Sequence, residues 1–427
     1  MQNGGSKSGI IAIRVSTESK RIYVRTRKWP FLLAGVLFVI PWLLLAWLYF
    51  GTPHSAIVET EKDPANPKYR IESGPWGELD CYEFITDPPL EFGADELFPP
   101  GDAEWHFGSI SREALAALLE SADLPKDVRA TLLAGAEFVP DQGWVMRPPD
   151  EAILNLSPTA RKRIYDELAK NQANRRQVDP FIFKPAQFDA WLAEGKFSPA
   201  VVANVRKLLY PHGDTMLLAD TVTLLKPIRD RDERRRLLNV LLRRSTVMVK
   251  LRLYEKSDIK ALANYWGAGG RQNEVLPLLE SLSLNPGGMR VDIALLLPPF
   301  ARNRLYMYPL PSLNPAAMHR DCHWTAFNFF SDMPDDKYAD PAKVKSQLVM
   351  NYAPISDAPR LGDIALLNTS DDRIVHSCVY IADDLYFSKN GPSHISPWVL
   401  MRLADVKALF PAYDGLAVKH YRLLKKS

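Results

Sequence analysis

The sequence predicts an α+β protein with one N-terminal transmembrane helix, a mostly helical middle domain, and a C-terminal domain in which a helix precedes an antiparallel sheet. Three observations lead to this fold class. Residues 31–50 are apolar and uncharged, capped segments with helical spacing begin near residue 109, and short strand-like runs bounded by turns fill the last third. A chain of 427 residues is long enough for two or three such domains.

The charges are divided unevenly along the chain. Residues 1–28 hold seven Lys or Arg and one acidic residue, whereas the remainder holds 46 basic and 49 acidic residues. The bulk of the protein therefore offers no basic surface for nucleic acid, and we expect no nucleic-acid partner.

A transmembrane helix is predicted over residues 29–50. Its twenty uncharged residues, 31–50, match a hydrocarbon core of about 30 Å, and Trp29 and Trp47 supply interfacial aromatic rings. The alternatives are a signal peptide, for which the run is too long and lacks an Ala-x-Ala site, and a buried core helix, for which the flanking charges are too one-sided. The positive-inside rule predicts a bacterial inner (cytoplasmic) membrane location, with residues 1–28 as a cytoplasmic tail and residues 51–427 on the periplasmic or external side.

A polar, proline-containing linker is predicted over residues 51–75, followed by a mostly helical domain over residues 76–285. Capping residues predict where the helices of that domain begin and end. The helices are expected over residues 111–120, 124–133, 156–165, 197–206 and 257–266. Their spacing is irregular, so the sequence does not predict an internal repeat.

Two further segments of the middle domain have clear patterns. The charge run at residues 229–244 becomes amphipathic, which favours a solvated helix face over a site for an anionic polymer. Residues 246–254 alternate between apolar and polar side chains and predict a strand. No catalytic set is visible here, and an envelope protein is a candidate partner for this domain.

The C-terminal domain is predicted over residues 286–427. A helix beginning near Cys322 is followed by strand-like runs that are joined by turns, including a tight turn at Asp383 and Asp384. A helix packed on an antiparallel meander is an α+β arrangement. The predicted strands are residues 291–297, 304–308, 362–368, 374–381 and 385–390.

Cys322 is the candidate nucleophile because it stands at the start of an apolar, aromatic-rich helix. Unpaired backbone N–H groups and the positive end of the helix dipole stabilise a thiolate there and lower its pKa. The competing interpretation is an inert thiol in the core. Cys81 and Cys378 are expected to be buried free thiols rather than a disulfide.

His376 is the candidate base for this thiol. It lies 54 residues after Cys322 near the start of a predicted strand, from which it could sit opposite the helix N-terminus. Ser388 and Asn390 share one face of the next strand, so either could hydrogen-bond the imidazole and fix its tautomer. His323 is expected to project away from the thiol.

These residues resemble a known enzyme family. Asp321-Cys322, Gly362-Asp363-Ile364 and the run from His376 to Ile381 are similar to motifs of the papain-like cell-wall cysteine hydrolases of the NlpC type and of their relatives, the CHAP amidases. The resemblance covers about residues 300–425 and implies a papain-like domain. In enzymes of the NlpC type, the third catalytic residue falls near the position of Ser388; in CHAP amidases, it is closer in kind to Asn390. Instead of the usual Ser-Gly after the nucleophile, this chain has His323 and Trp324.

The resemblance implies hydrolysis of an amide bond in a peptidoglycan stem peptide or cross-link through an acyl-enzyme. Cys322 would attack the carbonyl, His376 would move the proton, and backbone N–H groups would hold the oxyanion. Tyr306, Tyr308 and Trp324 are candidate substrate-binding residues, although the two tyrosines fit core aromatics equally well. No cofactor or metal is expected. The alternatives are acyl transfer on the same fold and a non-catalytic envelope binding protein.

Overall fold

The computed structural model describes residues 68–89, 98–310, 319–413 and 415–424. The expected cytoplasmic tail, the expected transmembrane segment and most of the expected linker lie outside these ranges. Among the helices that are described, none is both long and apolar enough to cross a bilayer.

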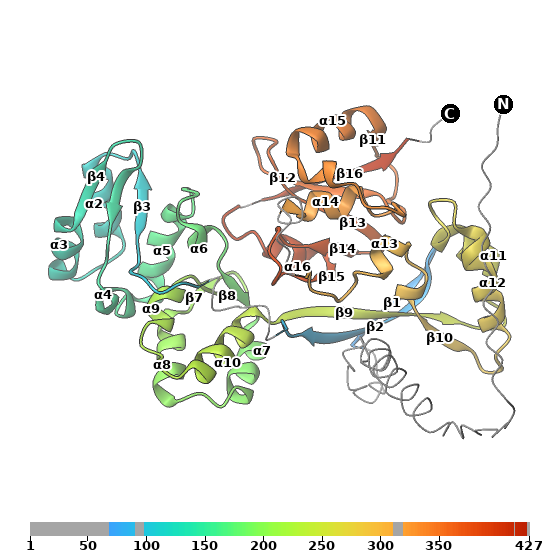
Figure 1. Cartoon of the computed structure of the whole chain (residues 1–427), viewed down its shortest axis with the longest axis horizontal. Helices are drawn as coiled ribbons and strands as arrows, with labels where there is room; N and C mark the ends of the chain where they lie inside the picture. Colours follow the sequence, from blue (N-terminus) through green and yellow to red (C-terminus); the bar gives the residue numbers. More distant parts are fainter. Residues whose placement is uncertain (1–67, 90–97, 311–318, 414, 425–427) are drawn as a thin grey trace, which may run out of the picture. The chain divides into compact units, whose positions relative to one another are not determined.

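The described residues combine helices with antiparallel sheets, in agreement with the α+β class (Figure 1). One four-stranded sheet has the order β1-β2-β9-β10, and two helices follow β9 in the sequence. The strands are β1 (Tyr69–Gly74), β2 (Gly77–Thr86), β9 (Arg244–Leu253) and β10 (Met289–Asp292), and the helices are α11 (Ile259–Trp266) and α12 (Gln272–Ser283).

A six-stranded antiparallel sheet in the order β11-β16-β12-β13-β14-β15 occupies the C-terminal part. Its strands are β11 (Tyr352–Pro354), β12 (Ile364–Asn368), β13 (Ile374–Ala382), β14 (Leu385–Lys389), β15 (Trp398–Arg402) and β16 (Ala417–Leu423). The helices of this part are η3 (Ile293–Leu295), α13 (Pro299–Arg302), α14 (Cys322–Phe327), η5 (Asp336–Ala339), α15 (Pro341–Asn351) and α16 (Leu403–Ala408).

Both faces of the six-stranded sheet are buried. Ile364 and Leu366 of β12 and Val379 of β13 join a core that also contains the apolar residues of α14. Ala365 and Leu367 of β12 alternate with them and join a second, smaller core on the opposite face, where Val406 of α16 packs. The two faces therefore have different partners, and the face on which a side chain lies decides what it can contact.

The four-stranded sheet shares its core with α14 and the six-stranded sheet. Leu79 of β2, Val249 of β9 and Leu279 of α12 belong to the same buried cluster as Trp324 and Phe387. The expected boundary between residues 285 and 286 therefore cuts through a continuous core. The structure instead separates residues 98–242, whose apolar side chains form a cluster of their own.

Residues 98–242 contain the same order of elements twice, which the irregular spacing in the sequence had concealed. Each copy is a β-α-α-β-β-α-α unit with a three-stranded sheet, ordered β3-β5-β4 in the first and β6-β8-β7 in the second. The first copy is β3 (Trp105–Gly108), α2 (Arg112–Ser121), α3 (Lys126–Ala134), β4 (Ala136–Val139), β5 (Gly143–Met146), α4 (Asp150–Leu154) and α5 (Pro158–Leu168). After α6 (Arg175–Val178), the second copy is β6 (Phe181–Phe183), α7 (Pro185–Glu194), α8 (Pro199–Leu208), β7 (Tyr210–His212), β8 (Thr215–Leu218), α9 (Thr221–Leu225) and α10 (Arg231–Leu242).

Side-chain contacts also repeat between the two units. An arginine in the first turn of each final helix donates to a carbonyl near the end of the preceding short helix. Arg161 Nη2 donates to the Ile153 oxygen at 2.7 Å, and Arg234 Nη1 donates to the Leu225 oxygen at 3.2 Å. The repeated element order, sheet order and arginine contact together show that this segment is an internal structural repeat.

Most of the helices and strands expected from the sequence are confirmed. Ser111 and Ser157 accept backbone N–H groups as helix caps, β9 covers the alternating run, and the charge run forms α10. The expected strand at 291–297 is wrong beyond Asp292, where the chain turns into η3. The expected strand at 304–308 is also wrong: Leu305 makes one isolated bridge, and Tyr306 has a positive φ.

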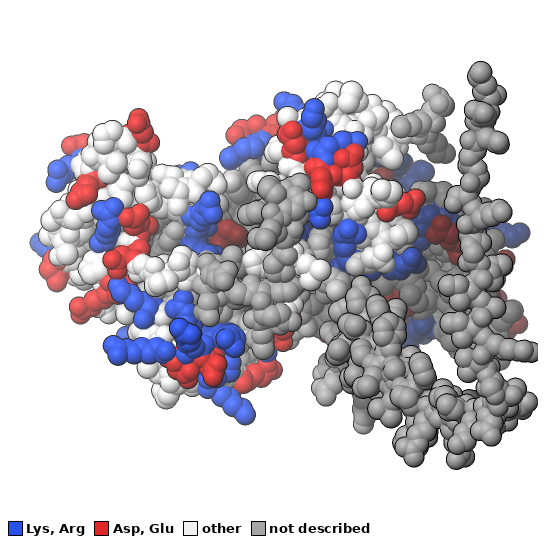
Figure 2. All heavy atoms as spheres, viewed as in Figure 1, with Lys and Arg blue, Asp and Glu red and all other residues white. Residues whose placement is uncertain are grey.

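Basic and acidic side chains are interspersed on the face of the molecule drawn in Figure 2. On α5, the exposed side chains of Lys162 and Asp166 form an ion pair at 2.6 Å.

Gly362, just before β12, is expected to tolerate no side chain. Its φ is +92°, and an added Cβ would lie 2.1 Å from the Phe330 ring. Gly270 is a matched control, because its φ is +87° and an added Cβ would have no neighbour within 4 Å. Urea unfolding should therefore find Gly362→Ala less stable than Gly270→Ala by about 1–3 kcal/mol, the usual cost of overpacking. Equal losses would show that the Phe330 contact does not restrict this turn.

Candidate active site

The candidate nucleophile lies at the first residue of α14. The Asp321 carboxylate caps this helix by accepting the backbone N–H groups of His323 at 2.8 Å and Trp324 at 3.0 Å. The Thr325 hydroxyl donates to the Asp321 carbonyl at 2.8 Å and closes the same turn. These bonds fix the backbone on both sides of Cys322.

The Cys322 thiol is buried, with 6% of the residue exposed. Burial first, and the neighbouring Asp321 carboxylate second, raise the pKa of this thiol to about 12, against a partial lowering by Ser377 and Lys389. The expected lowering of the thiol pKa at the start of the helix does not occur, because desolvation of the thiolate outweighs the effect of its polar neighbours. The thiol of the free protein is therefore protonated at neutral pH and needs a proton acceptor.

His376 is not that acceptor in this structure. Its cross-strand neighbour Leu367 belongs to the core on the α16 face of the sheet, and its ring packs against Phe410, 5.0 Å between centroids. α14 packs on the other face. Within the described residues, no hydrogen bond joins His376 to Cys322, so the expected pairing of these two side chains is wrong.

The expected partner of His376 is nevertheless found on the next strand. His376 Nε2 and Ser388 Oγ are 2.9 Å apart, and both residues are buried. Burial, and to a smaller extent the nearby His323, lower the pKa of His376 to about 3. Asn390 lies one residue beyond β14 and makes no hydrogen bond to any residue that the structure describes.

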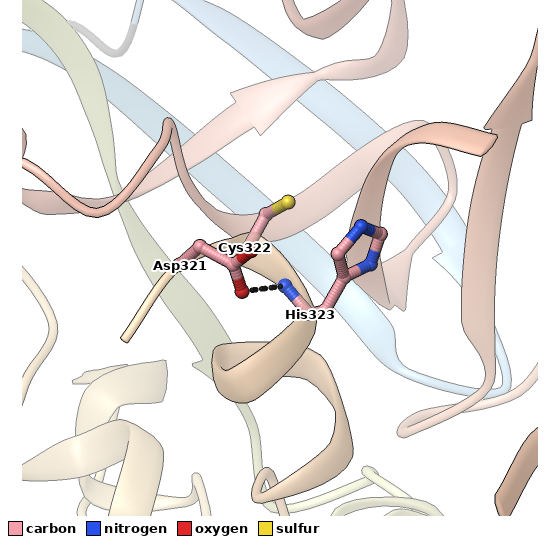
Figure 3. Close-up of side chains that lie close together, drawn as sticks. All are labelled: Asp321, Cys322 and His323. Carbon is pink, nitrogen blue, oxygen red and sulfur yellow. Dashed lines mark hydrogen bonds between the residues drawn. The ribbon is translucent and has the colours of Figure 1, made fainter. Parts of the chain in front are cut away.

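His323 lies beside the thiol, contrary to expectation. A ring nitrogen of His323, the Cys322 sulfur and an Asp321 carboxylate oxygen all lie within 4.8 Å of one another. Figure 3 shows the thiol and the imidazole on the same side of the first turn of α14. His323 Nδ1 and Ser377 Oγ are 2.7 Å apart, so the α14 face of β13 holds this ring in place.

The electrostatics of His323 suit a proton acceptor. Burial lowers its pKa, and the Asp321 carboxylate offsets part of that effect. The imidazole is therefore neutral at neutral pH and has a lone pair available. Cys322, His323 and Ser377 are thus a candidate nucleophile, a candidate base within 4.8 Å of the sulfur, and a group that orients this base. No hydrogen bond joins the thiol to the imidazole among the described residues, so thiol catalysis would need that bond to form when substrate binds.

The same cluster is a poor metal site. One Asp321 oxygen already accepts two backbone N–H groups, and the Cys322 thiol is protonated at neutral pH. Metal binding would require a thiolate and free carboxylate lone pairs. The donor set therefore suits proton transfer better than coordination.

The three expected substrate-binding aromatic residues lie in the core. The Tyr306 hydroxyl donates to the Val247 carbonyl at 2.8 Å, and the Tyr308 hydroxyl donates to the Thr86 carbonyl at 3.1 Å. Trp324 is 1% exposed, and its Nε1 donates to Asp336 at 3.0 Å. The core interpretation of the tyrosines is therefore favoured, and Trp324 packs in the core as well.

No protein-family model, curated protein or solved structure matches the chain. The sequence pattern did not indicate His323 as a candidate base or Ser377 as its hydrogen-bond partner. The available signal was the serine directly after His376, which has to lie on the opposite face of the same strand.

Proposed function

We propose that this chain is a membrane-tethered cysteine hydrolase that cleaves amide bonds in peptidoglycan stem peptides or cross-links. The observation that carries the proposal is the cluster of Cys322, His323 and Ser377 at the start of α14, with all three groups on one face of the sheet. The similarity of the surrounding motifs to cell-wall cysteine hydrolases supplies the substrate class. The uncharged segment at residues 31–50 supplies the tether.

In the proposed reaction, the Cys322 proton passes to His323 as the sulfur attacks the amide carbonyl. The carbon–sulfur bond forms, the carbonyl oxygen becomes an oxyanion, and collapse of this intermediate expels the amine, which takes the proton from His323. Water then attacks the thioester with His323 as the base, and the acid and free thiol are released. The backbone N–H of Cys322 is a candidate donor to the oxyanion, because it has no partner among the described residues.

A second function, a non-catalytic envelope binding protein, is favoured by one observation. The thiol is buried and burial raises its pKa to about 12. Such a thiol is inert until a substrate or partner changes its surroundings. The second function predicts peptidoglycan binding without cleavage.

The test is digestion of purified peptidoglycan by the full-length protein in detergent, followed by mass spectrometry of the soluble fragments. We expect fragments with new amine and carboxylic acid ends, each pair differing from its parent by one water. Protein alkylated at Cys322 with iodoacetamide, and mapped by peptide analysis, should release none. Identical fragments from native and alkylated protein would overturn the hydrolase proposal, and products carrying an added amine would identify acyl transfer instead.

A further inference from the structure

Lys389 is a buried ammonium next to the candidate site that the proposed reaction leaves unused. It is the last residue of β14 and is fully buried. Its Nζ donates to the backbone carbonyls of Gly391 and of Ser393, the latter at 3.0 Å. Within the described part of the chain it forms no ion pair with a carboxylate. Burying an ammonium that has only neutral hydrogen-bond acceptors costs free energy, so its presence at this position needs an explanation.

The register of the sheet places Lys389 on the same face as the candidate thiol. Leu385 and Phe387, which precede it at alternate positions on β14, both belong to the core that includes α14. The groups that raise the pKa of Lys389 are the Cys322 thiol first and the Asp321 carboxylate second. The lysine therefore faces the start of α14, where a negative charge would form when the thiol loses its proton.

A tryptophan fixes the lysine against this helix. Lys389 Nζ lies 5.7 Å from the centre of the Trp398 ring, and Trp398 Nε1 donates to the Thr325 hydroxyl of α14 at 3.0 Å. Arg304 also lies 5.8 Å from the Trp398 ring. On this face of the sheet, the titratable and charged groups around the thiol and the lysine are thus Asp321, His323 and Arg304, whereas His376 lies on the opposite face of β13.

We propose that Lys389 is a positioning residue that acts through Cys322, with its buried ammonium pairing with the thiolate. This inference rests on the proposed function for the role of the thiol. The ammonium lowers the free energy of the thiolate without taking the proton, which still passes to His323. Burial lowers the pKa of Lys389 to about 7, so the ammonium is present below that pH and is lost as the pH rises through it.

Alkylation of Cys322 tests this pairing without any cell-wall substrate. The thiolate attacks the methylene carbon of iodoacetamide, a carbon–sulfur bond forms and iodide leaves, so the rate follows the thiolate population. In full-length protein at pH 6, where Lys389 is protonated, the alkylation rate should fall by roughly 10- to 1,000-fold in Lys389→Met. Lys389→Arg keeps a positive charge and should restore the rate. Lys419→Met, which removes an exposed lysine from β16 of the same sheet, should leave it unchanged.

A second measurement uses the unsubstituted protein and does not depend on whether a variant folds. Iodoacetate is anionic and iodoacetamide is neutral, so an ammonium beside the sulfur raises the ratio of their rates. We expect this ratio to fall as the pH rises through about 7, where Lys389 loses its proton. A ratio that does not change with pH, or an unchanged alkylation rate at pH 6 in folded Lys389→Met, would overturn the pairing. Slower alkylation of Lys389→Met at pH 6, together with no peptidoglycan cleavage by the unsubstituted protein, would overturn the hydrolase proposal alone.

Discussion

Replacing His323 with alanine is expected to slow both peptidoglycan cleavage and Cys322 alkylation at pH 7, and to lower kcat/KM by about 10²–10⁴-fold. This is the usual contribution of a positioned general base. His376→Ala should cost stability, because it empties a buried position, but should have little effect on either rate. Rates should be measured with iodoacetamide and with peptidoglycan fragments, using Cys322→Ala as the baseline.

Two serine variants remove the hydroxyl that each imidazole contacts, and the Ser377 variant also removes a group that lowers the pKa of the Cys322 thiol. Ser377→Ala releases His323 and should slow alkylation, whereas Ser388→Ala releases His376 and should not. Thermal unfolding of each variant separates lost structure from lost chemistry. If Ser388→Ala and His376→Ala lowered the rates while the His323 and Ser377 variants did not, the base would be His376 after all.

The pH dependence of the same rates distinguishes the two histidines further. Activity needs neutral His323 and is lost as the pH falls through its pKa, which burial places below the ordinary 6.5. His376 acts on stability instead. The unfolded chain binds a proton below about pH 6.5 and the folded chain does not until about 3, so stability falls with decreasing pH in that window. In His376→Ala, the free energy of unfolding should therefore fall less over this pH range, whereas the reaction rate should still decrease at low pH.

Replacing Asp220 with alanine is expected to lower the free energy of unfolding by about 3–5 kcal/mol, the cost of breaking a buried ion pair from one side. Asp220 accepts hydrogen bonds from the Arg161 guanidinium and the Tyr165 hydroxyl, and all three residues are buried. Burial raises the pKa of Asp220, although the arginine opposes this effect. Without the carboxylate, Arg161 keeps its charge and has only neutral acceptors, the Tyr165 hydroxyl and the backbone carbonyls of Ile153 and Lys207.

The measurement is urea unfolding of Asp220→Ala beside an exposed control. Asp166→Ala removes a carboxylate that pairs with Lys162 on the surface of α5, and such a pair contributes about 1 kcal/mol or less. A double variant, Arg161→Met with Asp220→Leu, removes both charges and should recover most of the stability. Similar losses in the Asp220 and Asp166 variants would contradict the interpretation.

Local chemistry allowed much of the fold to be predicted. Ser111 and Ser157 mark helix starts because a hydroxyl next to apolar helical spacing satisfies orphan N–H groups. The alternation of apolar and polar side chains predicted β9, because one face of this strand joins the core and the other does not. The strand expected at residues 304–308 was wrong because the run is short and mostly apolar. Such a run has no strong local preference, so its tertiary contacts decide its structure.

The site was only partly predictable, because both faces of the six-stranded sheet are buried. Strands with two apolar faces carry no alternation to show which face a helix covers. An irregularity in the pairing of β12 with β13 lies directly beside His376, and a shift of one residue exchanges the faces. Cys322 and the His376–Ser388 pair could therefore be predicted as local features, but their placement on opposite faces could not.

The two repeated helical units lie in a segment whose two ends are neighbours. Thr86, the last residue of β2, pairs with Arg244, the first residue of β9, so the chain leaves and re-enters the sheet at one position. When the two ends of a segment are neighbours, the entropy cost of closing it as a loop rises only slowly with the length of the segment. The whole segment could thus be inserted into or removed from the connection between β2 and β9 without rethreading any strand of the four-stranded sheet.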